Sequence, residues 1–84
     1  MNKYFALRKT NRMRTELLTE KSQEQLKEVI RYLRRVSWDF CGIELVRSDL
    51  LDIAIQANKE NQELFHSISD AKTFVEEVKP SLKT

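Results

Sequence analysis

The scarcity of turn-forming residues is the feature that most limits what this chain can fold into. The 84 residues include one glycine, Gly42, and one proline, Pro80. An all-β domain of this length needs many tight turns, which require glycine, proline, asparagine or aspartate at defined positions. Glycine-rich phosphate-binding loops are excluded for the same reason. The composition therefore favours an all-α protein, and the length suffices for one domain, residues 1–84.

Apolar residues recur with helical spacing nearly throughout the chain. The most regular stripe follows a Ser22–Gln25 capping box and comprises Leu26, Val29, Ile30, Leu33, Val36 and Phe40. Gly42, the run from Asn58 to Asn61, and Pro80 each predict the end of a helix. The predicted fold is a small three-to-four-helix bundle, with helices at about 3–18, 23–40, 43–58, a short 62–68 and 70–79.

The first and third predicted helices have broader apolar patterns. On the first, one side of the helical wheel carries Ala6, Thr10, Met13 and Leu17. On the third, a main stripe from Ile43 to Ala57 is accompanied by Leu51 and Ile55, which lie roughly 120° away on the wheel. Since a surface helix has a single apolar stripe, the third helix is either the centre of the bundle or one side of a dimer. We expect Leu51, Ile55 and Trp38 to contact a second copy or another protein.

Basic side chains are concentrated in the first part of the chain. Residues 1–35 hold ten basic and four acidic side chains, whereas residues 36–84 hold five basic and nine acidic ones. Seven of these cations, with one tryptophan, form a candidate nucleic-acid patch on the first two helices: Arg8, Lys9, Arg12, Lys27, Arg31, Arg34, Arg35 and Trp38. Such a patch can follow a phosphate backbone while the tryptophan, which a regular helix would place against Arg34, stacks on a base. Alternatively, Trp38 is buried and the arginines are solvated or paired with Glu24 and Glu28.

Motifs for catalysis or metal binding are sparse. Glu63 and His66 have the Glu-x-x-His spacing of di-iron bundles. Such a site needs two of these motifs and two further carboxylates, and the chain has one histidine. Cys41 is expected to be a small packing residue at a helix end. We therefore expect a non-enzymatic protein with no metal, no cofactor and no small-molecule substrate.

Targeting signals and membrane segments are not expected either. No stretch has the apolar length of a secretory signal or of a membrane-spanning helix. A single cysteine allows no disulfide within the chain. The sequence predicts a cytoplasmic protein without a membrane partner.

Three segments carry a resemblance to a known family. They are Val29-Ile30-Arg31-Tyr32-Leu33-Arg34, the acidic and aliphatic run from Glu44 to Ile53, and the step Ile68-Ser69-Asp70 that leads into Phe74–Val78. Residues 26–79 resemble small all-helical proteins of Gram-positive bacteria, a domain of unknown function loosely labelled "DNA-binding ferritin-like". Asn61 and Ser69 stand where that family has glycines, and Ala71 and Val75 where it has aspartate and cysteine.

The resemblance implies a helical fold and, by analogy with the label, nucleic-acid binding, without catalytic residues. A looser resemblance, in size and number of helices, is to bacteriocin immunity proteins. From the residues themselves we expect a homodimeric regulatory or accessory module that acts by binding protein. Nucleic-acid binding through the basic patch is the alternative, and an immunity-like function is the second alternative.

Overall fold

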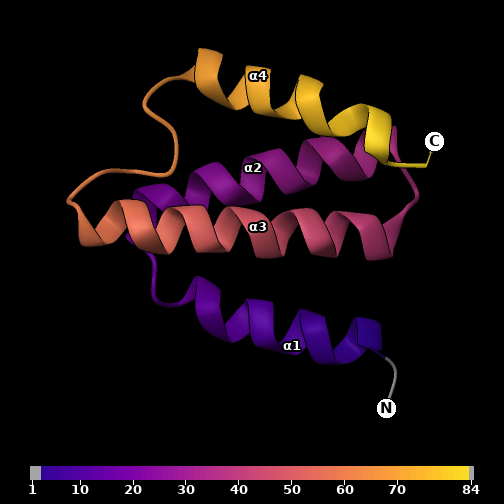
Figure 1. Cartoon of the computed structure of the whole chain (residues 1–84), viewed down its shortest axis with the longest axis horizontal. Helices are drawn as coiled ribbons and strands as arrows, with labels where there is room; N and C mark the ends of the chain where they lie inside the picture. The colour runs from indigo at the N-terminus through magenta and orange to yellow at the C-terminus, as the bar shows by residue number, and fades with distance from the viewer. Residues whose placement is uncertain (1–2, 84) are drawn as a thin grey trace.

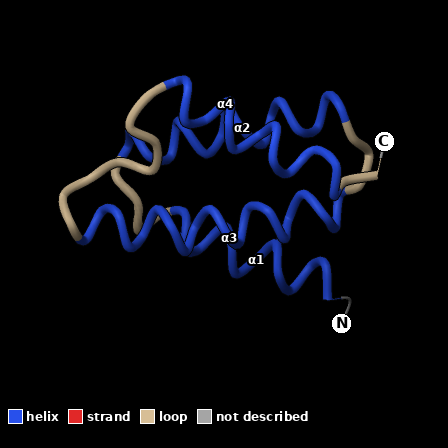
Figure 2. The backbone as a smooth tube through the Cα atoms, turned by 45° about the horizontal axis from the view of Figure 1, so that its top comes forward, coloured by secondary structure: helices blue, strands red, loops and turns tan. Residues whose placement is uncertain are grey.

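A computed structural model describes residues 3–83, and these residues form helices and connections without a strand. The helices are α1 (Lys3–Thr15), α2 (Glu20–Val36), α3 (Phe40–Lys59) and α4 (Ile68–Val78), followed by a 3₁₀ turn, η1 (Lys79–Ser81). They lie side by side in the order α1, α3, α2, α4, so the molecule is flat, with Cα extents of 33 × 30 × 15 Å (Figure 1). The connecting segments lie at the two ends of the bundle (Figure 2). This confirms the all-α fold class.

The apolar core lies between α2, α3 and α4. Leu33, Leu50 and Ala54 are completely buried there, and Val75 of α4 belongs to the same core cluster. Burying one such leucine stabilises the fold by roughly 1.5–3 kcal/mol. No helix within residues 3–83 has both the length and the apolar character needed to cross a membrane.

Both ends of α2 differ from the sequence prediction: the helix covers Glu20–Val36 instead of 23–40, and Phe40 is the exposed first residue of α3. Thr19, rather than Ser22, caps α2, and its Oγ1 accepts a hydrogen bond from the Ser22 N–H at 3.2 Å. Asp39 caps α3 by accepting from the Gly42 N–H at 3.0 Å, so Gly42 lies in the first turn of α3 and ends no helix. A Cβ on Gly42 would lie 2.5 Å from Asp39 Oδ2 and 2.9 Å from Leu82 Cδ2. A side chain here would have to displace the Asp39 carboxylate that caps α3 and the end of the Leu82 side chain.

The predicted short helix over 62–68 is wrong, because side chains of α2 hold this segment as a loop. Ser22 Oγ donates to the Glu63 carboxylate at 2.7 Å and accepts from the Leu64 N–H at 3.1 Å. The Gln25 amide bonds both the N–H and the C=O of Phe65, at 3.1 and 3.0 Å. These contacts satisfy backbone groups that a helix would otherwise pair. The predicted stop before the loop is confirmed, since Asn61 has a left-handed φ of 62°.

The predicted apolar side of α1 is also wrong. Ala6, Thr10, Met13 and Leu17 are exposed, whereas Asn11 is the one residue of α1 that is buried. The helix turns this way because its polar residues find partners on α3, as described below. For α4 the prediction holds: Val75 is buried and Ala71, Phe74 and Val78 pack against the core.

Candidate nucleic-acid interface

Polar contacts hold α1 against α3. Asn11 Nδ2 donates to the backbone oxygen and to the carboxylate of Glu44, at 3.1 and 3.0 Å. Arg14 pairs with the Asp52 carboxylate and contacts Ser48 Oγ at 3.5 Å. Because α1 lies along one side of α3 and α2 along the other (Figure 1), a groove remains between the basic faces of α1 and α2.

Cations from three helices line this groove. Its two adjoining parts have volumes of about 410 and 360 Å³ and share Thr15, Arg34 and Arg47 in their lining. We call it the arginine groove and define it by its basic residues Arg8, Arg12, Lys27, Arg31, Arg34 and Arg47. Glu16 and Glu24 are the acidic residues in its lining.

Most of the charge of the arginine groove is not compensated. The ion pairs within residues 3–83 are Arg14–Asp52, Arg47–Glu44 and Lys79–Glu76. Among the described groove cations, Arg47 is thus the one with a carboxylate partner, and that partner, Glu44, lies in the interface with α1. An anion in the groove would meet the guanidinium groups of Arg8, Arg12, Arg31 and Arg34, none of which forms an ion pair within residues 3–83.

Arg47 shows the repulsion among these cations most directly. Its Nε is buried without a hydrogen-bond acceptor and lies 3.5 Å from Glu44 Oε1. Burial lowers the pKa of Arg47; Glu44 opposes this effect, and the positive charges of Arg34 and Arg8 add to it. A bound anion would relieve the repulsion among these positive charges.

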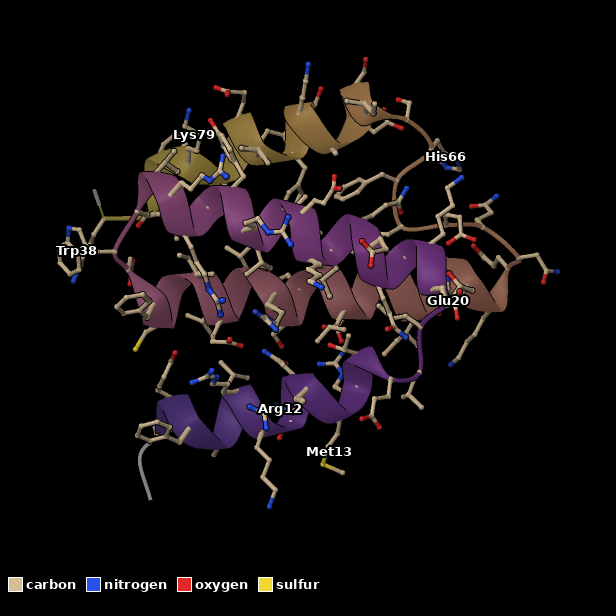
Figure 3. All side chains as sticks on the ribbon, turned by 180° about the vertical axis from the view of Figure 1, so that it is seen from behind. Arg12, Met13, Glu20, Trp38, His66 and Lys79 are labelled. Carbon is tan, nitrogen blue, oxygen red and sulfur yellow. The ribbon has the colours of Figure 1, made fainter. Side chains whose placement is uncertain are left out.

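Five of the eight residues of the predicted patch line the arginine groove, and three lie elsewhere. Lys9 is exposed on α1 outside the groove lining. Arg35 and Trp38 lie with Arg34 around a smaller hollow of about 280 Å³ where α2 meets α3. Trp38 is 62% exposed and extends from this end of the molecule (Figure 3), and Phe40, also exposed, lines the same hollow.

The predicted surroundings of Trp38 need two corrections. Because α2 ends at Val36, Trp38 lies in the connection to α3, and the expected stack of Arg34 on its ring is not formed. The cation–π contact within residues 3–83 is Lys79 over the Tyr32 ring, at 5.8 Å. The alternative of a buried Trp38 is equally wrong for the single chain. The indole ring is therefore open to a ligand at one end of the arginine groove.

Arg47 is the groove residue that sequence reasoning missed. It lies four residues after Ile43 and four before Leu51, both of which are completely or almost completely buried. Residues four apart share a helix face, so an arginine stands within the apolar face of α3. A charged residue on a helix face that otherwise carries buried apolar residues was the sequence feature that could have identified Arg47.

The predicted partner contact through Leu51 is wrong. Leu51 is 0% exposed and belongs to the core of the single chain, and Ile55 packs against that core. α3 contacts both α1 and α2, and most of both apolar stripes is covered within the single chain, although Ile53 of the main stripe is exposed. Of the three residues predicted to contact a partner, Trp38 is the one that remains widely exposed.

The residues considered for catalysis or metal binding do not line the arginine groove. Glu63 is in the loop before α4, where its carboxylate accepts from the Thr19 and Ser22 hydroxyls at 2.6 and 2.7 Å, and His66 is exposed. Within residues 3–83, no three His, Cys, Asp or Glu side chains gather into a group that could hold a metal ion. Cys41 is exposed in the first turn of α3, contrary to the packing role expected at a helix end.

The arginine groove and Trp38 are thus the candidate site of this chain. Similarity searches found no match to a protein-family model, to the curated proteins or to the solved structures. What the site binds must follow from its own chemistry.

Proposed function

We propose that this protein binds single-stranded nucleic acid through the arginine groove. The observation that carries the proposal is the row of six cations from α1, α2 and α3, of which only Arg47 has a carboxylate partner within residues 3–83. Guanidinium groups donate pairs of hydrogen bonds to phosphate oxygens. A groove rich in them favours a polyanion over a neutral ligand. The predicted cytoplasmic location is part of this proposal, because nucleic acid is accessible there.

The exposed rings beside the groove favour a single strand over a duplex. In a single strand, a base is free to turn onto the Trp38 ring, whereas duplex bases are already stacked on one another. One such stack contributes roughly 1–3 kcal/mol and tolerates any base. Since phosphates supply most of the other contacts, binding should depend little on sequence.

The salt dependence of binding follows from the number of cations. Each phosphate neutralised on a single strand contributes about 0.7 to the slope of log affinity against log salt concentration. Six groove cations therefore set an upper limit of roughly 4 for that slope.

The test is a fluorescence-anisotropy titration of labelled random-sequence oligonucleotides, single-stranded and duplex, at a series of salt concentrations. The variant Arg31→Gln/Arg34→Gln should lower the slope by about 1–1.5. A matched control, Lys59→Gln/Lys72→Gln, removes the same charge from exposed positions on α3 and α4 outside the groove and should keep most of the slope. Trp38→Ala should weaken single-strand binding more than duplex binding.

Two results would contradict the proposal. One is the absence of binding at roughly 50 µM protein in about 50 mM salt, where electrostatic binding of this kind is strong. The other is an equal loss of slope in the groove variant and in its control, which would mean that net charge acts without a site. Circular dichroism of each variant checks that the helices are retained.

A further inference from the structure

The outer side of α1 carries an apolar stripe that nothing within the described chain covers. Met13 and Leu17 are 63% and 71% exposed, and Met13 points away from the other helices (Figure 3). The opposite side of α1 contacts α3 chiefly through Asn11 and Arg14. A helix of 13 residues is marginal without tertiary packing of its apolar side. Covering this stripe would therefore stabilise α1.

α3 presents a second uncovered stripe beside the first. Leu45 and Ile53 are 59% and 50% exposed, and the exposed Asp49 lies between them. Arg14 is four residues after the exposed Thr10 on α1, next to Met13 on the same stripe, and Asp52 is three residues after Asp49 on α3, so each borders its own stripe. Because Arg14 and Asp52 pair with each other, both stripes lie on the same side of the α1–α3 pair.

We infer that this side of the molecule is the interface of a homodimer. We call it the apolar face and define it by Met13, Leu17, Leu45 and Ile53. Half of the broad side of the molecule, with Cα extents of 33 × 30 Å, has a projected area of about 500 Å² before side chains are included, and a standard interface buries ~800 Å² per partner. A two-fold axis lets the same face meet itself without leaving an open end that could form fibres.

Charge determines how the two faces meet. Lys9 borders the α1 stripe, since it lies three residues after Ala6 and four before Met13, and Asp49 borders the α3 stripe. Packing α1 on α1 would bring two Lys9 side chains together, and packing α3 on α3 would bring two Asp49 side chains together. Packing α1 on α3 of the partner subunit instead places Lys9 beside Asp49 twice. This pairing of opposite charges favours packing α1 on α3 of the partner subunit.

The dimer leaves the arginine groove free. Arg8 lies about 140° from Met13 on the helical wheel of α1, and Lys9 does not line the groove. Dimerisation and nucleic-acid binding therefore use different sides of the molecule. A variant that is monomeric should still bind an oligonucleotide, so failure of one proposal is distinguishable from failure of the other.

The test is sedimentation equilibrium in the micromolar range. The wild type should have a mass of about 20 kDa, twice the 10.0 kDa of the chain. Leu17→Glu/Leu45→Glu should be a monomer that retains its helical circular dichroism. The control Ile68→Glu changes a residue that is 77% exposed on α4 and should remain a dimer.

The charge pairing has its own test. Lys9→Glu and Asp49→Lys should each weaken dimerisation by about tenfold or more, and the two changes combined should restore it. A wild-type mass near 10 kDa throughout the range would overturn the inference. Dissociation of the Ile68→Glu control, or failure of the double reversal to restore the dimer, would also overturn it.

Discussion

Replacing Leu51 by alanine separates a core role from an interface role. The Leu51 side chain is fully buried within the single chain. Its truncation loses the transfer free energy of the removed carbons and leaves a cavity, at a combined cost of about 3–4 kcal/mol. A domain of this size has roughly 4–12 kcal/mol of stability, and its melting temperature should therefore fall by roughly 12–30 °C.

The assay is urea unfolding followed by circular dichroism at two protein concentrations that differ widely. If Leu51 acts only in the core, Leu51→Ala should lower the free energy of unfolding, relative to the wild type, by the same amount at both concentrations. The control Ile68→Ala, at an exposed position, should change it by less than about 0.5 kcal/mol. A loss below about 1 kcal/mol for Leu51→Ala, or one that disappears at high concentration, would refute a purely internal role for this side chain.

Two further outcomes concern stability. Gly42→Ala should destabilise the fold by about 1–3 kcal/mol in urea unfolding, because its Cβ would meet Asp39 Oδ2 at 2.5 Å and displace the cap of α3; an unchanged midpoint would contradict this close approach. Hydrogen bonds from Thr19 and Ser22 lower the pKa of Glu63, so its contribution to stability is complete above the ordinary pKa of a glutamate and is lost as pH falls through the lowered value. Thermal melts from neutral pH to about pH 3 should therefore show a shallower acid decline for Glu63→Gln than for wild type, and parallel curves would exclude the linkage.

Local features of the sequence were sufficient for the fold class and for most of the helices. The stripe of α2 as far as Val36 and the apolar side of α4 were correctly predicted, because the period of apolar residues reports the buried side of a helix. Phe40, predicted as the last residue of the α2 stripe, is instead the exposed first residue of α3. The stop at Asn61 followed from its tolerance of a left-handed backbone. Five of the six groove cations were also in the predicted patch, since they lie opposite the apolar sides of α1 and α2.

Contacts between residues far apart in the sequence determined the features that the period of apolar residues failed to predict. Ser22 holds Leu64, 42 residues away, and thereby keeps a short apolar segment from forming a helix. Asn11 bonds Glu44, 33 residues away, and this contact with the Arg14–Asp52 pair turns the apolar stripe of α1 outward. In each case a buried polar group needed a hydrogen-bond partner. That requirement outweighed the preference of the local sequence for a helix at 62–68 and for a buried apolar side on α1.

The candidate site depends on both kinds of information. The sequence by itself determined that the chain is helical and that cations gather on one side of each of its first two helices. Only the tertiary structure placed α3 between them, which brought Arg47 into the arginine groove and Leu51 into the core. The physical reason is that a helix forms through contacts within one turn, whereas the neighbours of each helix face depend on how distant segments satisfy their buried polar and apolar groups together.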